Sequence, residues 1–161
     1  IDSRLRTIFN YDELFGTIVN RFITQAVIGY PLTVYGKGGQ TRGYLNIKDT
    51  LQCVHKAEQN PAKIGQLNIY NQIMETFSVN QLAELTQQAG TEIGFDIKIK
   101  NIENPRVELE EHYYNPTYQG LKELGVKPNY LTKQSMKDMF EIVAQHKDQI
   151  RKEVIFRGVK W

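Results

Sequence analysis

The first hydrophobic pattern along the chain is helical and runs from Glu13 to Ile28. Apolar side chains recur there every four residues, which places them on one face of a helix. The residues of this face are Leu14, Ile18, Phe22 and Ala26. The sequence GYP follows, and it ends the pattern because glycine and proline interrupt helices. We therefore predict an amphipathic helix over this range.

Short β-rich runs come next, on either side of a glycine-rich segment. LTVY (residues 32–35) and YLNI (residues 44–47) have the composition of strands, and GKGGQTRG between them is typical of a turn or loop. Asp49 has the residue type of an N-cap, here for a helix through Glu58. After the breaker NPAKIG, the run LNIYN (residues 67–71) predicts a further strand.

The second half of the chain predicts two longer helices, with a strand and a short helix between them. Ser78 is placed to cap the first long helix and Thr132 the second. DIKIK (residues 96–100) alternates like a strand, and Pro116 suits the first turn of a short helix that ends at GVKP. The apolar stripes of the two long helices are Val79, Leu82, Leu85 and Ala89, and Met136, Met139, Phe140 and Val143. Helices alternating with short strands favour an α/β or α+β lobe over a helical bundle.

Length and charge narrow the class of protein. With 161 residues, 40% of them hydrophobic, the chain is long enough for one core and short for two, so we predict one domain. The net charge of +2 arises from 20 basic and 18 acidic residues without a block of like charge. This distribution argues against a nucleic-acid-binding arm and a membrane-surface patch. No apolar run approaches the length of a membrane span.

Cysteine and histidine give no sign of a disulfide or a metal site. Cys53 is the single cysteine, so an internal disulfide is excluded. His55, His112 and His146 are not spaced with other ligands as they are in zinc sites. We therefore expect a reducing setting and no bound metal.

The candidate chemistry is concentrated in the glycine segment, TVYGKGGQTRGYLNIKD. Glycine permits positive φ and the close approach of a ligand or another backbone, and it occurs at Gly36, Gly38, Gly39 and Gly43. Arg42 offers a planar fork that can bind a phosphate through two hydrogen bonds. A diphosphate-binding loop and a mobile loop with a solvated arginine both fit this pattern. The segment lacks a GK[ST] ending and a helix directly after it, so it is neither a Walker motif nor a dinucleotide fingerprint.

A family resemblance covers most of the chain. PLTVYGKGGQTRGYLNIKDT resembles the segment shared by extended short-chain dehydrogenase/reductases that act on nucleotide sugars, the NAD-dependent epimerase/dehydratase family. FNYDELFGTIVNRF and NPRVELEEHYYN resemble the branch of that family that joins sulfite to UDP-glucose. The similarity extends from Arg6 to about Lys147. Gly43 departs from the wider family, which usually has aspartate after the arginine, and agrees with the sulfite-using branch.

The resemblance implies nucleotide-sugar contacts in and beside the glycine segment. It places Thr33 to Tyr35 against the uracil, with backbone groups reading the edge of the base and Tyr35 packing near it. It places Arg42 on the diphosphate, where charge-assisted bonds of an arginine are strong. The structural alternative for Tyr35 is an aromatic residue of the core. Asn20 and Gln40 are polar neighbours that could reach the ligand.

Three further contacts are implied outside the glycine segment. Arg106 and Tyr113 match the spacing of a second phosphate-binding arginine and of an aromatic hydroxyl near the ligand. Thr17 matches a polar contact at the start of a helix. The structural alternatives are an ion pair between Arg106 and the glutamates that follow it, and a core position for Tyr113.

The cofactor and catalytic motifs of the family are not found in this sequence. No glycine-rich dinucleotide turn follows a first strand. Tyr118 and Lys122 have the spacing of the catalytic Tyr-x-x-x-Lys pair, but they follow NPR, outside the family's catalytic context, and we interpret them as coincidental. The resemblance thus implies that residues 1–161 are the nucleotide-sugar-binding, carboxy-terminal part of an α/β enzyme. A Rossmann-type NAD domain and all catalytic residues would lie upstream.

The expected function follows from the same resemblance. It implies an NAD-dependent enzyme whose substrates are UDP-glucose and sulfite. One alternative is a 4-epimerase or 4,6-dehydratase of the same family, which would ignore sulfite, and another is a non-catalytic nucleotide-sugar-binding module. Relatives are commonly dimers, so a homodimer is expected. We expect a cytoplasmic location, or the plastid stroma if a transit peptide precedes this sequence.

Overall fold

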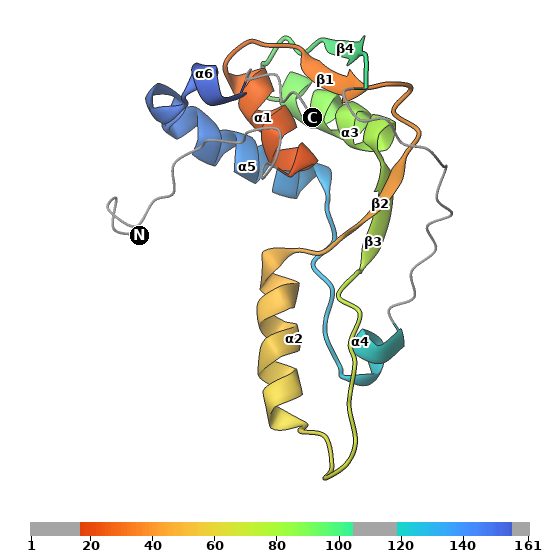
Figure 1. Cartoon of the computed structure of the whole chain (residues 1–161). Helices are drawn as coiled ribbons and strands as arrows, with labels where there is room; N and C mark the ends of the chain where they lie inside the picture. Colours follow the sequence, from red (N-terminus) through yellow and green to blue (C-terminus); the bar gives the residue numbers. More distant parts are fainter. Residues whose placement is uncertain (1–16, 105–118, 156–161) are drawn as a thin grey trace. The chain divides into compact units, whose positions relative to one another are not determined.

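Local sequence signals place most helices and strands, and packing gathers them into two units. The computed structural model describes residues 17–104 and 119–155 (Figure 1). Of the described residues, 17–40, 79–104 and 132–155 form unit 1, and 41–78 and 119–131 form unit 2. Each unit is built from segments that are distant in sequence, a division that the hydrophobic pattern does not indicate.

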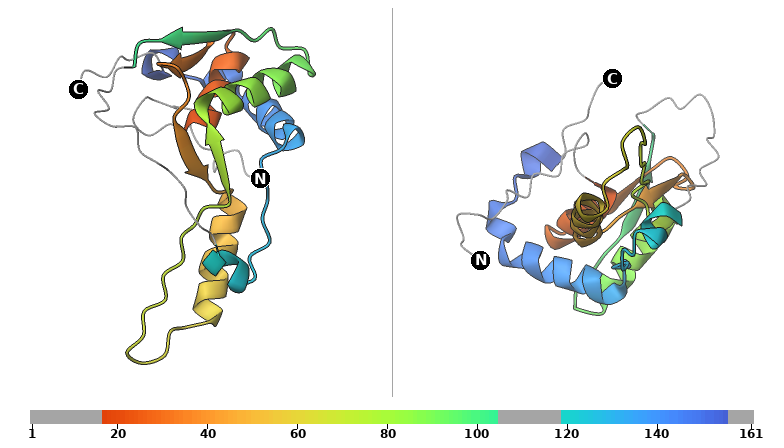
Figure 2. Two further views of the ribbon diagram at one scale, coloured as in Figure 1. Left: turned by 90° about the vertical axis from the view of Figure 1, so that its right-hand side faces the viewer. Right: turned by 90° about the horizontal axis from the view of Figure 1, so that it is seen from below.

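Unit 1 consists of helices packed against a short parallel strand pair. Strands β1 (Leu32–Tyr35) and β4 (Ile99–Ile102) pair in parallel, with Leu32 opposite Ile99. Helices α1 (Ile18–Val27), α3 (Val79–Thr91) and α5 (Lys133–Gln145) pack on one another, and Figures 1 and 2 show them on one side of these strands. The elements of unit 1 are α1 (Ile18–Val27), β1 (Leu32–Tyr35), α3 (Val79–Thr91), β4 (Ile99–Ile102), α5 (Lys133–Gln145), the 3-10 helix η2 (Lys147–Gln149) and α6 (Lys152–Ile155).

The predicted apolar stripes form the core of unit 1. Most of their members are buried, namely Phe22 and Ala26 of α1, Val79, Leu82 and Ala89 of α3, and Met136, Phe140 and Val143 of α5. Ile18, Leu85 and Met139 are half-buried at the edges of these faces. Gly90 lets α3 approach α5 closely, because a Cβ there would lie 2.8 Å from Cζ of Phe140. Phe95 stacks on the same ring with centroids 5.1 Å apart.

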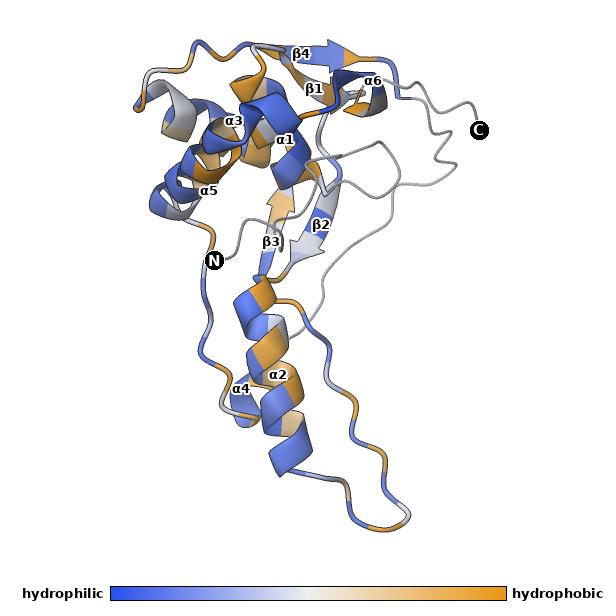
Figure 3. Cartoon of the chain, turned by 90° about the vertical axis from the view of Figure 1, so that its left-hand side faces the viewer, coloured by the Kyte–Doolittle hydropathy of each residue, from blue (hydrophilic) through white to orange (hydrophobic). Residues whose placement is uncertain are grey.

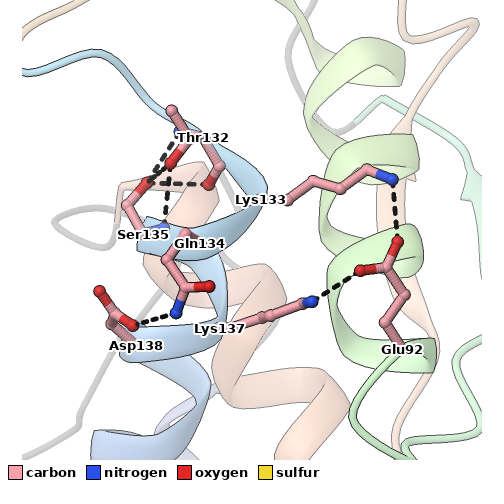
Figure 4. A network of polar contacts seen from close by, with 7 residues as sticks. All are labelled: Glu92, Thr132, Lys133, Gln134, Ser135, Lys137 and Asp138. Atoms are coloured by element: carbon pink, nitrogen blue, oxygen red, sulfur yellow. Dashed lines mark hydrogen bonds and ion pairs between the residues drawn. The ribbon is translucent and has the colours of Figure 1, made fainter.

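Polar contacts fix the start of α5 and link it to α3. Thr132 caps the helix as predicted, in a reciprocal capping box with Ser135. Glu92, just beyond α3, accepts from Nζ of Lys133 at 2.9 Å and from Nζ of Lys137 at 2.7 Å (Figure 4). One carboxylate thereby joins the end of α3 to the first turns of α5.

Unit 2 consists of an antiparallel ribbon and two helices. Its elements are β2 (Thr41–Tyr44), α2 (Ile47–Gln59), β3 (Glu75–Ser78) and α4 (Gln119–Glu123). Thr41 lies opposite Ser78 and Tyr44 opposite Glu75. A small apolar core forms between α2 and α4 from Cys53, Met74, Leu121 and Val126.

Three element predictions need correction at their boundaries. The first helix begins at Ile18, because Thr17 is its N-cap with extended backbone; Glu13 and Leu14 of the predicted range lie outside the described residues. The strand expected at 44–47 is Thr41–Tyr44, so Arg42 lies in a strand and not in a loop. The strand expected at 96–100 is Ile99–Ile102, where the chain pairs with β1.

The N-cap predicted at Asp49 is also wrong. Asn46 caps α2, and its side chain accepts from the backbone N–H of Lys48 at 3.0 Å. Asp49 is fully buried in the first turn, where its carboxylate accepts from the backbone N–H of Asn129 at 2.9 Å and from Nε2 of Gln52 at 3.1 Å. A tertiary contact therefore uses the aspartate that local sequence suggested as a cap.

The strand expected at LNIYN (residues 67–71) does not form, and β3 (Glu75–Ser78) was not predicted. A β-rich run becomes a strand only when it pairs with another strand, and within the described residues β2 pairs with β3 instead. Leu67 and Ile69 are consequently 81% and 74% exposed.

Two further features of the described ranges bear on function. Within residues 17–104 and 119–155, no helix is long and apolar enough to cross a lipid bilayer. No group of three or more His, Cys, Asp or Glu side chains is placed there to hold a metal ion.

Candidate functional site

The glycine turn of unit 1 is held by the start of α3. Gly36 and Gly38 have φ of 59° and 72°, a region that side-chain-bearing residues rarely adopt. Asn80 donates from its backbone N–H to the Gly38 carbonyl at 3.0 Å and from Nδ2 to the Lys37 carbonyl at 2.9 Å. A Cβ on Gly38 would overlap the Asn80 side chain and lie 2.6 Å from Cγ1 of Val34. The close approach that requires glycine at this position is therefore made by Asn80.

The turn does not have the form of a dinucleotide cradle. A bound dinucleotide needs a glycine turn whose chain runs directly into a helix N-terminus facing the pyrophosphate. Here the turn runs into strand β2, and the helix that meets it, α3, places Asn80 over Gly38. This turn therefore does not fit the pyrophosphate of NAD.

Arg42 is presented on the β2–β3 ribbon of unit 2. Its side chain is exposed, and Nη1 donates to the Thr41 carbonyl at 2.9 Å. Phe77 lies opposite it in the ribbon and makes an edge contact with Tyr44, with centroids 5.8 Å apart. Burial raises the pKa of Tyr44 above its ordinary value, and the charge of Arg42 opposes part of that rise. Arg42 is thus a solvent-accessible cation beside two aromatic rings, which suits an anionic ligand.

Thr33 lies in β1 with its polar groups bound to α1. It is 8% exposed, and its N–H donates to Oε1 of Gln25 at 3.1 Å. Its hydroxyl accepts from Nε2 of Gln25 at 2.8 Å, and its carbonyl accepts from Nη2 of Arg21 at 3.0 Å. The structure therefore brings Thr33 together with two α1 side chains that sequence reasoning did not select.

Tyr35 lies at the end of β1, beside the same helix. Its ring centroid is 4.7 Å from Cζ of Arg21, which is the geometry of a cation–π contact. Its carbonyl accepts from Nε2 of Gln40 at 3.3 Å, so Gln40 ties the glycine turn back to β1. The side chain is half-buried.

The sequence carried a signal for the two residues that were missed. Arg21 and Gln25 are one helical turn apart, and they flank Phe22 and Ala26 on the apolar face of α1. Long polar side chains beside a buried stripe indicate that the helix meets polar groups there.

The other predicted site residues have varied positions. Thr17 is exposed at the N-cap of α1 and makes no side-chain cap bond. Asn20 is half-buried, and its carbonyl accepts from the Thr24 hydroxyl at 2.9 Å. Arg106 and Tyr113 lie outside the described residues. Thr33, Tyr35 and Gln40 thus lie together in unit 1, and Arg42 belongs to unit 2.

The sequence is similar to curated enzymes of one kind. It is 48% identical over 153 residues, 95% of this chain, to the chloroplastic UDP-sulfoquinovose synthase of Spinacia oleracea. It is 42% identical over 163 residues, the whole of this chain, to the UDP-sulfoquinovose synthase of Sulfolobus acidocaldarius. This chain is a homologue of the UDP-sulfoquinovose synthases. It spans 32% and 42% of the length of these two relatives.

More distant relatives lie in the wider group of nucleotide-sugar enzymes. UDP-glucuronic acid decarboxylase 4 of Arabidopsis thaliana is 29% identical over 144 residues, which is 84% of this chain and 30% of the relative. No model of a known protein family matches the sequence. The family expected from the glycine segment and from the flanking segments is confirmed by the two synthase homologues.

Solved structures support the same fold. UDP-glucuronic acid 4-epimerase of Bacillus cereus, in complex with UDP-glucuronic acid and NAD, aligns over 81% of this chain and 40% of its own, with a TM-score of 0.64 and 18% identity. UDP-glucose 4-epimerase of Thermotoga maritima, with UDP-glucose, aligns over 85% of this chain and 41% of its own, with a TM-score of 0.64 and 21% identity. The likeness confirms the predicted α/β fold.

Proposed function

We propose that this chain is the nucleotide-sugar-binding, carboxy-terminal part of a UDP-sulfoquinovose synthase. The observation that carries the proposal is the 48% and 42% identity to two synthases over 95% and 100% of the chain. The proposed substrates of the whole enzyme are UDP-glucose and sulfite. The hydroxyl on C6 of the glucose is lost as water and a C6–sulfonate bond forms, so the net reaction is redox-neutral.

The residues of this chain bind and orient the nucleotide. Arg42, exposed on the ribbon, anchors the diphosphate through charge-assisted hydrogen bonds. Tyr35, at the end of β1, meets the uracil, and Thr33 supports the same strand from inside. Arg106, Tyr113 and Thr17 complete the proposed contacts. Fixing the nucleotide sets the position of the sugar, where a small displacement costs a large factor in rate.

NAD is assigned to a part of the protein outside this sequence. The glycine turn at residues 36–39 does not fit it, and the chain spans less than half of each synthase relative. The exposed face of α2 supports this division. Ile47, Leu51 and Val54 follow helical spacing and are 70%, 65% and 59% exposed. Figure 3 shows hydrophobic stretches along the ribbon of α2. An apolar stripe of this kind is suited to being covered by another part of the protein.

Assembly and location complete the proposal. A homodimer is proposed from the expected family likeness. The spinach relative is named as chloroplastic, which supports the plastid stroma where the host cell has plastids, and the cytoplasm is proposed otherwise.

The deciding experiment uses the full-length protein with UDP-glucose, NAD and sulfite. Mass spectrometry should find a nucleotide sugar that carries a sulfonate and that forms only when sulfite is present. An epimer or a dehydrated sugar formed without sulfite would move the protein to the 4-epimerase or 4,6-dehydratase activity. Binding of UDP-glucose without turnover would favour a non-catalytic module.

A further inference from the structure

Arg21 is a buried cation that no carboxylate neutralises within the described residues. Its side chain is 6% exposed, and the ion pairs of the described ranges do not include it. Its Nε has no hydrogen-bond partner there, although it is shielded from solvent. Burying an unpaired charge and an unpaired donor both cost stability. A side chain that only stabilised the fold at this position would be better apolar.

Besides a contact with the ring of its neighbour Phe22, whose centroid lies 5.6 Å from Cζ, the Arg21 side chain makes two contacts with β1. Nη2 donates to the Thr33 carbonyl at 3.0 Å, and Cζ lies 4.7 Å from the centre of the Tyr35 ring. One planar group therefore holds a main-chain oxygen and an aromatic ring two residues further along the strand. Arginine suits both contacts better than lysine, because a guanidinium can lie flat against a ring while an N–H at its edge donates to the carbonyl.

Gln25 completes the support of the strand. It binds the N–H and the hydroxyl of Thr33, while Arg21 binds the carbonyl of the same residue. Each polar group of Thr33 is thus engaged by α1, so Thr33 is a support and not itself a reader of the base. Tyr35, which Arg21 touches directly, is left as the side chain of β1 that meets the ligand.

We propose that Arg21 is a positioning residue for the uridine end of the nucleotide sugar. It holds the Thr33 carbonyl and the Tyr35 ring in one arrangement, so that β1 and the ring have their binding conformation before the pyrimidine arrives. The inference rests on the proposed function, which puts β1 against the uracil. It goes beyond that function because it assigns base selectivity to a buried residue of α1.

The test distinguishes the contribution of the base to binding from that of the diphosphate, because UDP and ADP share the diphosphate and differ in the base. In the full-length protein, the affinities for UDP and ADP are measured by calorimetry for the wild type, Arg21→Met, Arg21→Lys and Arg42→Ala. Arg21→Met should weaken UDP binding roughly tenfold, on the order of one lost charge-assisted hydrogen bond, and leave ADP binding nearly unchanged. Arg42→Ala should weaken both ligands alike. Arg21→Lys should recover part of the preference for UDP, because it restores one donor to Thr33.

Thermal melting distinguishes a positioning role of Arg21 from a purely structural one, because only a structural role requires the protein to lose stability when Arg21 is replaced. Arg21→Met removes a buried charge that no carboxylate of the described residues neutralises, and this gain offsets the lost hydrogen bond to the Thr33 carbonyl, so its melting temperature should stay close to that of the wild type. If the ratio of the UDP affinity to the ADP affinity in Arg21→Met equals that of the wild type, the inference is overturned, whether both affinities are unchanged or both fall equally. The proposed function would still stand in that case, provided that the wild type binds UDP. If Arg21→Met fails to fold, the ratio of the UDP affinity to the ADP affinity is measured in Arg21→Lys instead. A ratio equal to that of the wild type would overturn the inference. Absence of UDP binding by the folded wild type would overturn both.

Discussion

Single residues of the glycine segment have separate roles. Gly38 is required by a contact inside unit 1, because Asn80 occupies the space that a side chain would need. Gly39 has nothing within 4 Å of an added Cβ and no positive φ. Arg42 lies beyond the turn, in a strand, with an exposed side chain. Gly38 is thus needed for the conformation of the turn, and Arg42 supplies a positive charge that an anionic ligand could use.

Gly38→Ala should destabilise the protein by about 2 kcal/mol or more. A left-handed φ costs a side-chain-bearing residue roughly 1–2 kcal/mol, and the overlap with Asn80 and Val34 adds to it. Gly39→Ala is the matched control and should change the free energy of unfolding by less than about 0.5 kcal/mol. Urea titration of both variants measures the difference, and equal stabilities would contradict the assigned contact.

Arg42→Ala should weaken the binding of UDP-glucose at least tenfold, or about 1.4 kcal/mol, since a hydrogen bond to a charged group contributes about 1.5–3 kcal/mol. Arg42→Lys keeps the charge but loses the planar fork, so it should recover only part of the affinity. Isothermal titration calorimetry checks both variants. A wild-type dissociation constant in Arg42→Ala would remove Arg42 from the proposed diphosphate site.

At the scale of elements, ion pairs and caps decide how helices meet. Glu92 accepts from Lys133 and Lys137, and these two hydrogen bonds lower the pKa of its carboxyl to about 2. The capping box at Thr132 fixes the first turn of α5, from which Lys133 projects, and Lys137 follows one turn later (Figure 4). The attachment of α3 to α5 therefore includes a contact that depends on pH.

The stability supplied by Glu92 should be present at neutral pH and lost in acid. Its folded-state pKa lies below the ordinary value of 4.5, so the contribution is complete above that value and falls away as the pH drops toward 2. Glu92→Gln removes the titrating group. Melting temperatures of the wild type and this variant should differ at pH 7 and converge near pH 2. A difference that stays constant over this range would contradict the assignment.

The sequence predicted helices better than strands. The stripes through Phe22, Leu82 and Phe140 were found because a helix satisfies its backbone locally and its periodicity is visible in one segment. Short strands depend on partners elsewhere in the chain, so LNIYN was mistaken for a strand and ETFS was overlooked. The site shows the same limit. Arg42 was chosen as a candidate from its motif, and its role stays a prediction. Arg21 and Gln25 were not chosen, because their partner Thr33 is identified only once α1 is packed against β1.

At the scale of the whole molecule, the described units leave apolar surface in solvent. Unit 2 exposes Ile47, Leu51 and Val54 on one face of α2, together with Leu67 and Ile69 in the segment after it. Its own core is small and is centred on Cys53 and Leu121. A small core beside much exposed apolar surface agrees with the lengths compared above, since this chain spans 32% and 42% of the length of its two synthase relatives.

Leu51→Ser in the full-length protein tests whether this face is covered. A residue that stayed 65% exposed would change the free energy of unfolding by less than about 0.5 kcal/mol when replaced. If another part of the protein packs on it, the loss should be about 2 kcal/mol or more. Glu58→Ser on the same helix is the control and should have little effect. Chemical denaturation of the two variants gives the answer, and a neutral Leu51→Ser would contradict the proposed cover.

The contact between Asn80 and the glycine turn limits which substitutions can accumulate at these positions during evolution. Because the Asn80 side chain fills the place where a Cβ at position 38 would stand, position 38 cannot gain a side chain while Asn80 keeps its place. A relative that carries a larger residue at position 38 should also carry a smaller one at position 80. Two sites on different elements would then be inherited as a pair, and paired substitution across a family could reveal the contact without any structure.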